Sequence, residues 1–111
     1  MAGTLKRLAG PAFVAASATN IYVPSAATIF GEVRHIHLVN KDVAARTVSL
    51  YLGITGGSAS GTELFKDLSL AASGLYDYYA LMKQTSTDFL TGVASVVSTI
   101  VITVEGYEYV V

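Results

Sequence analysis

The chain has 111 residues, of which 52% are hydrophobic and only 14% are charged. Seven Lys and Arg against eight Asp and Glu give a formal net charge of −1, which offers no electrostatic basis for binding nucleic acid. The absence of cysteine excludes disulfides, a thiolate nucleophile and a cysteine zinc site, and the length suits one domain. Soluble domains usually carry about 25% charged residues, so we expect other subunits to cover part of this surface.

The first eleven residues, 1–11, are expected to form an extended N-terminal arm that precedes a β-sandwich domain over residues 12–111. The arm has few apolar side chains to bury, so we expect Leu5 and Leu8 to anchor it on a neighbouring subunit. Lys6 and Arg7 would lie at the rim of that contact. The alternative is that this segment pairs with the sheet of its own chain.

After a β-prone segment over residues 19–23, the best-patterned stretch is 32–54, which predicts two strands joined as a hairpin. A polar turn begins at Asn40. In the first strand, alternation gives two faces, namely Arg34, Ile36, Leu38 and Asn40 against Val33, His35, His37 and Val39. In the second strand, the predicted core face is Val48, Leu50 and Leu52, and the opposite face is Thr47, Ser49 and Tyr51.

Residues 55–61 are rich in glycine, but they lack the spacing of a dinucleotide site and the Lys-Ser/Thr ending of a nucleotide loop. We interpret them as a loop at one end of the sandwich. Further strands are predicted at 67–71, 75–82 and 98–105, after which Gly106 indicates a bulge or a close backbone approach.

Tyrosines gather in two of these strands. We expect Tyr76, Tyr78, Tyr107 and Tyr109 to contribute to subunit contacts, because interfaces are enriched in tyrosine. A tyrosine-rich strand can also present a platform for a sugar, which is the alternative interpretation of the 75–82 strand.

The count is about eight short strands with turn signals between them and no convincing helix. This pattern predicts an all-β fold, a single antiparallel β-sandwich that resembles a jelly roll. The longest apolar stretch, 92–104, is interrupted by Ser and Thr and is shorter than the roughly 18 residues that a spanning helix needs, so no membrane contact is expected.

No catalytic constellation emerges, because no serine lies in a nucleophile elbow and the carboxylates fall in turns or at strand margins. We therefore expect neither an enzyme nor a cofactor. His35 and His37 are weak candidates for a metal site, because their i, i+2 spacing places both rings on one face of a strand. Two ligands do not complete a site, although six histidines around a three-fold axis would.

Several segments, taken together, resemble a family of small tailed-bacteriophage virion proteins. They are HLVNKDVAARTVSLYLG, GGSASGTEL, YDYY, DFLTGVAS and ITVEGYEYV, and they cover most of the chain from about Thr28 onward. The resemblance implies no catalytic residues. It implies a β-sandwich that binds other virion subunits.

The most direct expectation from this resemblance is a capsid decoration, or cementing, protein that binds the major capsid protein of an assembled shell. Such a protein would be located in the virion, assembled in the host cytoplasm. The low charge and apolar composition of the chain also lead us to expect a homo-oligomer, with a trimer favoured. Two alternatives stay open: a tail, collar or head-tail accessory protein of the same virion, and a small carbohydrate-binding module.

Overall fold

The computed structural model describes residues 3–53 and 60–110, which form eight β-strands and no helix. The strands are β1 (Gly3–Phe13), β2 (Thr19–Tyr22), β3 (Ile29–Asn40), β4 (Arg46–Gly53), β5 (Glu63–Leu70), β6 (Leu75–Gln84), β7 (Phe89–Ala94) and β8 (Ile100–Val110). The predicted all-β sandwich is confirmed. The glycine-rich loop predicted at 55–61 lies outside the described residues except for its last two positions.

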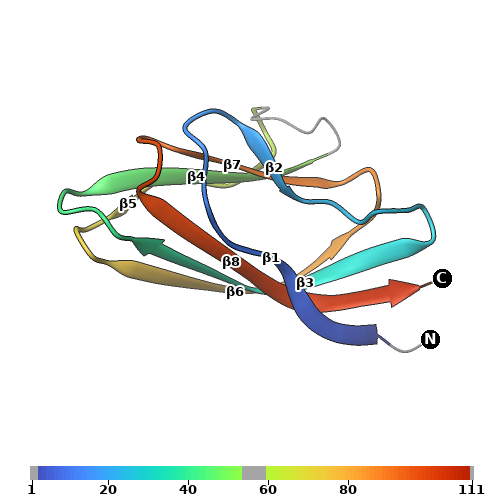
Figure 1. The fold of residues 1–111 in the computed structure, drawn as a ribbon. Coiled ribbons are helices and arrows are strands. Elements are labelled where there is room, and N and C mark those ends of the chain that lie inside the picture. The colour runs from blue at the N-terminus through green and yellow to red at the C-terminus, as the bar shows by residue number, and fades with distance from the viewer. Residues whose placement is uncertain (1–2, 54–59, 111) are drawn as a thin grey trace.

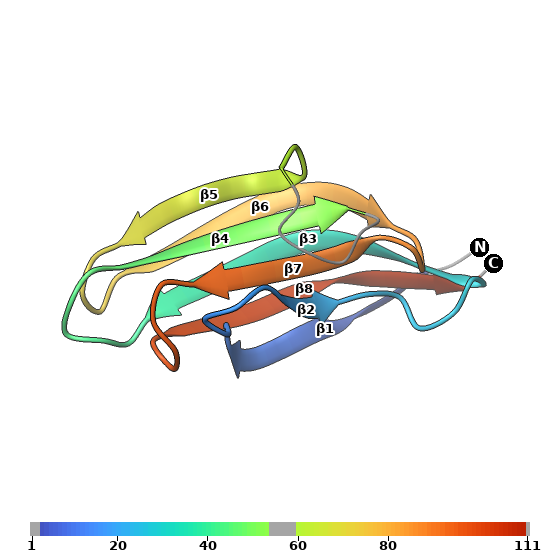
Figure 2. The ribbon, with the colours of Figure 1, turned by 90° about the horizontal axis from the view of Figure 1, so that it is seen from above.

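Two antiparallel sheets of four strands form the two layers seen in Figure 1 and, from above, in Figure 2. We call β1-β8-β3-β6 the first sheet and β2-β7-β4-β5 the second sheet. Strand β1 pairs with β8, β2 with β7, β3 with β6 and β4 with β5. This nesting is that of one long hairpin rolled up into a sandwich, which is the jelly-roll arrangement.

The core fills the space between the sheets and draws on almost every strand. Its fully buried side chains include Ile36 and Leu38 from β3, Leu50 from β4 and Ile102 from β8. Burying one such side chain stabilises the fold by about 1.5–3 kcal/mol. Leu52, predicted for the core, is only partly buried and packs against the margin of the cluster.

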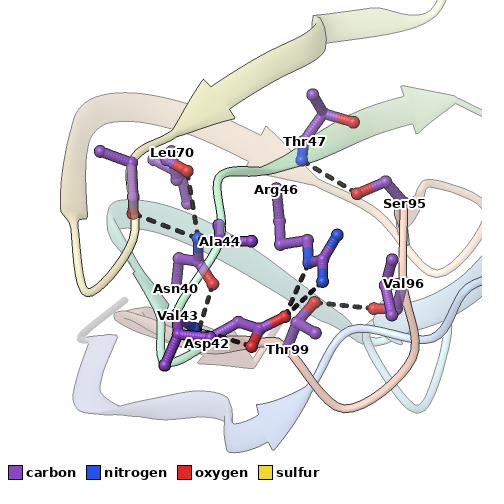
Figure 3. A network of polar contacts seen from close by, with 11 residues as sticks. Asn40, Asp42, Val43, Ala44, Arg46, Thr47, Leu70, Ser95, Val96 and Thr99 are labelled. Atoms are coloured by element: carbon purple, nitrogen blue, oxygen red, sulfur yellow. Dashed lines mark hydrogen bonds and ion pairs between the residues drawn. The ribbon is translucent and has the colours of Figure 1, made fainter.

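The predicted hairpin over residues 32–54 is wrong in its pairing. Strands β3 and β4 lie in different sheets, so the segment between them crosses from one layer to the other. Asn40 makes this crossing possible, because its fully buried side chain bonds the backbone of two separate turns (Figure 3). Its Nδ2 donates to the carbonyl oxygens of Ala44, Leu70 and Ala71 at 2.9–3.1 Å. Its Oδ1 accepts the N–H of Asp42 at 3.0 Å.

An ion pair completes the same corner (Figure 3). Nε and Nη2 of Arg46 lie 2.7 and 2.6 Å from Oδ2 of Asp42, and the N–H of Val43 donates to Oδ1. Arg46 first and the Val43 amide second hold the pKa of the Asp42 carboxyl below its usual value. The turn therefore stays closed on itself while Asn40 ties it to the turn between β5 and β6.

The predicted facing of β3 holds from Ile36 onward and fails before it. Val33 is fully buried and Arg34 is exposed, because the register shifts between Val33 and His35. Gly106 lies opposite this bulge, and a Cβ on it would lie 2.0 Å from the carbonyl oxygen of Glu32. The close backbone approach expected at Gly106 is confirmed.

Alternation in β4 suggests that Thr47, Ser49 and Tyr51, which lie opposite the core face, are exposed, but two of them are not. Ser49 and Tyr51 are buried. Oγ of Ser49 accepts the backbone N–H of Asp67 at 2.8 Å, at a bulge where Asp67 has a φ of 53°. Tyr51 lies opposite the buried Thr91 of β7. The polar side chain of Ser49 is thus used to satisfy a neighbouring strand rather than to meet water.

The segment predicted as an arm forms most of strand β1. From Gly3 onward it pairs with β8, so β1 begins where β8 ends (Figure 1). The boundary expected between residues 11 and 12 falls inside this strand, near an irregularity at Gly10 and Pro11. Pairing with the sheet of its own chain, the second of the two sequence interpretations, describes this segment.

We predict that Asn40→Asp destabilises the fold by about 2–4 kcal/mol, because it removes the donors to three carbonyls and buries a carboxylate. Chemical denaturation measures the change in free energy of unfolding. Asn20→Asp, the same substitution at an exposed position of β2, is the control and should change stability by less than about 0.5 kcal/mol. Equal losses in the two variants would contradict the role given to Asn40.

We also predict that Gly106→Ala costs about 3 kcal/mol or more, because the new methyl group would meet backbone that cannot move aside. Gly61→Ala is the control: Gly61 has a φ of 96° but nothing within 4 Å of its added Cβ, so only the dihedral cost of about 1–2 kcal/mol applies. Thermal unfolding should rank Gly106→Ala as the less stable variant, and the reverse order would mean that the bulge tolerates a side chain.

Candidate functional site

The outer face of the first sheet, meaning the face turned away from the core, gathers most of the chemically distinctive side chains. The pairing register places His35, His37 and Asp77 on it, with Glu105 on the adjacent β8. The face also carries exposed apolar side chains at its two edges: Leu5 on β1 and Leu75, Tyr79 and Leu81 on β6.

Two histidines and one carboxylate meet at the centre of this face. His37 lies directly opposite Asp77 in the β3–β6 pairing. Oδ1 of Asp77 lies 2.7 Å from Nε2 of His35 and 2.5 Å from Nδ1 of His37. One donor atom from each residue lies within 4.8 Å of the other two, which is close enough for a shared metal ion. The half-buried side chains leave the cluster open to solvent on one side.

The two rings also act on the acid between them. Hydrogen bonds from the two histidines hold the pKa of the Asp77 carboxyl below its usual value, because they favour its ionised form. The bond from His37 has the larger effect and that from His35 the smaller. On the other side of His35, Nδ1 lies 3.5 Å from Oε1 of Glu105. The ring of Tyr79 stacks on His35 with centroids 4.5 Å apart, which restricts the ring to one plane.

A second aromatic group occupies the same outer face toward the end where β8 finishes. Tyr109 stacks on Phe30 with centroids 4.9 Å apart, and Tyr107 stacks beside Tyr109 at 6.2 Å. Arg34 lies over the ring of Tyr107, and Lys83 lies over Phe30. Both predicted contact residues on β8, Tyr107 and Tyr109, are therefore half-buried by their own chain and still reach the surface.

The other two predicted contact tyrosines serve a different place. Tyr76 and Tyr78 turn their edges toward Phe65 of β5, with ring centroids 6.2 and 5.9 Å from it. They thereby close the margin of the sandwich between β6 and β5. Tyr78 packs against the core, so the two rings do not form an open platform for a sugar.

The four candidates on β1 divide between surface and interior. Leu5 is 66% exposed and Arg7 is exposed, whereas Leu8 packs against the core of its own chain. Nζ of Lys6 lies 2.9 Å from Oε1 of Glu108, and the hydroxyl of Tyr22 donates to Oε2 at 2.6 Å. Glu108 thus connects β1, β8 and the second sheet.

One small pocket, of about 140 Å³, lies beside β1 and β2. Its described lining is mostly apolar or small, including Ala9, Phe13 and Ile21, with Thr19 and Asn20 as its polar members, and contains no titratable side chain. Pockets for drug-sized ligands usually measure roughly 300–1,000 Å³. Neither the size nor the lining of this pocket points to a reaction centre.

Sequence reasoning found both histidines of the cluster but missed Asp77, Glu105 and Tyr79. Asp77 could have been found only by aligning β3 with β6, because the two strands are about 40 residues apart and their register depends on the bulge near Arg34. The signal that existed was alternation, which places Asp77 and Tyr79 on the same face of β6.

A scan against protein-family models and a search of curated proteins each found no match to this chain. None of the described residues forms a helix that is long and apolar enough to cross a membrane.

We predict that Tyr22→Phe lowers the free energy of unfolding by about 1–2 kcal/mol at neutral pH, because Glu108 loses a buried donor. The hydrogen bond from the Tyr22 hydroxyl is the main reason why the pKa of Glu108 is lowered. Burial acts in the opposite direction, and Lys6 lowers the pKa further. A lowered acid pKa stabilises the fold above the unfolded value of about 4.3 and loses that effect as the pH falls through the folded value.

The stability difference between wild type and Tyr22→Phe should therefore stay constant near neutral pH and shrink in acid. It should also shrink above about pH 10, because burial first and Glu108 next raise the pKa of Tyr22. Urea titrations at several pH values measure it. Tyr76→Phe, which alters a partly exposed ring, is the control, and a pH-independent difference for Tyr22→Phe would disprove the coupling.

Proposed function

We propose that the protein is a non-enzymatic structural subunit of a bacteriophage virion, which binds the assembled shell as a capsid decoration protein. It acts as a symmetric oligomer, with a trimer favoured, and it contacts its neighbours through the outer face of the first sheet. The resemblance of the sequence to small phage virion proteins supports the location, and the fold suits it, because jelly rolls are common in viral capsid proteins.

The observation that carries the proposal is the difference between the two outer faces of the sandwich. On the first sheet, Leu5 is 66%, Leu81 71% and Tyr79 74% exposed. On the second sheet, the described residues of β2, β4, β5 and β7 include no exposed large apolar side chain. Exposed apolar side chains rimmed by charge are typical of a protein interface, whereas a face without them offers a partner little apolar contact area.

Charge on the first face supports a protein partner rather than a lipid or nucleic acid. The pairing register and the contacts of Arg34 place three cations on this face, Arg7, Arg34 and Lys83, together with three acids, Glu32, Asp77 and Glu105. Arg34 forms an ion pair with Glu32 and lies over the ring of Tyr107. Because cations and acids on the face are equal in number, it has no basic excess with which to bind phosphates. What it offers is apolar contact area with a polar rim.

An alternative within the virion, a tail or collar component, would use the same face. The carbohydrate-binding alternative gains one observation, the exposed ring of Tyr79, but loses the platform expected from Tyr76 and Tyr78. A glycan array tests it directly, and binding to a defined sugar that depends on Tyr79 would favour this alternative over the decoration role.

We predict that the purified protein sediments as an oligomer at micromolar concentration and that Leu81→Glu and Leu5→Glu each raise its dissociation constant at least about tenfold. Each substitution replaces a contact worth about 1.5–3 kcal/mol with a charge that must stay hydrated. The two positions lie on opposite edge strands of the sheet, so they test the face as a whole.

Val97→Glu is the matched control, because Val97 is 63% exposed but lies in the turn before β8. It should sediment like wild type. A monodisperse wild-type monomer that also fails to bind shells would contradict the proposal. A map of intact particles from the phage that encodes the chain then distinguishes capsid from tail, and its absence from both would overturn the virion assignment.

A further inference from the structure

The His35, His37 and Asp77 cluster brings one nitrogen of each imidazole to the same carboxylate oxygen. A neutral imidazole carries one N–H, so only one of its two ring nitrogens can donate. His35 faces a carboxylate on both sides, with Nε2 2.7 Å from Asp77 and Nδ1 3.5 Å from Glu105. One tautomer of His35 donates from Nε2 to Asp77, whereas the other carries its proton on Nδ1, beside Glu105, and directs the Nε2 lone pair toward Asp77. In the second tautomer the Nε2 lone pair and the Asp77 carboxylate converge on one position, which a cation can occupy.

The donor set matches that of a transition metal. Two imidazoles and a carboxylate suit zinc and its first-row neighbours, whereas calcium and magnesium take oxygen ligands. Two ligand atoms that each lie about 2.1 Å from an ion are at most about 4.2 Å apart. The three donor atoms already lie within 4.8 Å of one another, so small side-chain rotations would seat an ion.

The surroundings also hold the ligands in place. Metal-bound histidines commonly donate their second N–H to a carboxylate, which orients the ring and increases its basicity. Glu105 lies in that position on His35, and the stacked ring of Tyr79 restricts the rotation of the imidazole. His37 and Asp77 are registered partners on neighbouring strands, so the backbone sets their separation.

We propose that Nε2 of His35, Nδ1 of His37 and the carboxylate of Asp77 bind one divalent transition-metal ion of the zinc class, with Glu105 as a positioning residue. The fourth coordination position faces away from the sheet. A single chain supplies all three ligands, so the site does not require histidines to meet on a three-fold axis, and it does not rest on the proposed function.

The test uses full-length, tag-free protein stripped with a chelator. Added Zn²⁺ should raise the melting temperature by about 4–10 °C, since an ion that binds only the folded state stabilises it. Ca²⁺ and Mg²⁺ should not. Titration with Co²⁺ followed by visible absorption reports coordination directly and does not depend on any variant remaining stable.

His35→Gln, His37→Gln and Asp77→Asn should each abolish the Zn²⁺-dependent shift, measured against the metal-free melting temperature of the same variant. Glu105→Gln should retain binding but weaken it about 10–100-fold, as expected for a residue that orients a ligand. Glu63→Gln, an exposed acid at the start of β5, is the control and should leave the shift unchanged. No shift and no Co²⁺ absorption in the wild type, or an equal shift in Asp77→Asn, would overturn the site.

Discussion

The structure depends on one buried amide, the side chain of Asn40. A chain that leaves one sheet and enters the other exposes backbone groups at the bend, and buried groups of this kind must be paired. Asn40 pairs four of them, in its own turn and in the turn between β5 and β6. A hydrophobic residue could fill the same space but would leave those groups without partners. An asparagine here therefore specifies the crossing, and the crossing specifies the jelly roll.

Once β3 and β4 lie in different sheets, few positions remain at which the other strands can pair with them. Strand β8 fills the space beside β3, and β7 fills the corresponding space beside β4. Strands β1 and β2 then pair with β8 and β7 and form one edge of each sheet. Glu108 connects these two edge strands, since it bonds Lys6 on β1 and Tyr22 on β2. The rolled hairpin thus carries a polar tie at each end: Asn40 at one and Glu108 at the other.

Alternation predicted the class of fold and most of the core, because period-two burial is a local property of each strand. It did not predict that β3 and β4 separate, because a crossing and a hairpin begin with the same Asn-containing turn. The metal candidates show the same division. The sequence shows that His35 and His37 share one face of a strand, because this follows from their i, i+2 spacing. It does not show that Asp77 lies beside them, because that depends on the β3–β6 register, which a bulge shifts. The sequence predicts that Leu8 anchors an arm on a neighbouring subunit, because it does not show that β1 pairs with β8 of the same chain and that Leu8 packs against that chain's core.

The His35, His37 and Asp77 cluster lies on the face proposed to bind other subunits, next to the exposed ring of Tyr79. A partner side chain that reached the open coordination position would bind both the protein and the ion. By thermodynamic linkage, the ion would then strengthen that contact by the same factor by which the contact strengthens ion binding. A face of this composition can also bind a partner without the ion, because Leu5, on the opposite edge strand β1, and Leu81, further along β6 than Asp77, are not ligands of the proposed site. The proposed assembly and the proposed metal binding would therefore be separable events on one surface, and the size of their coupling would depend on what the partner places opposite Asp77.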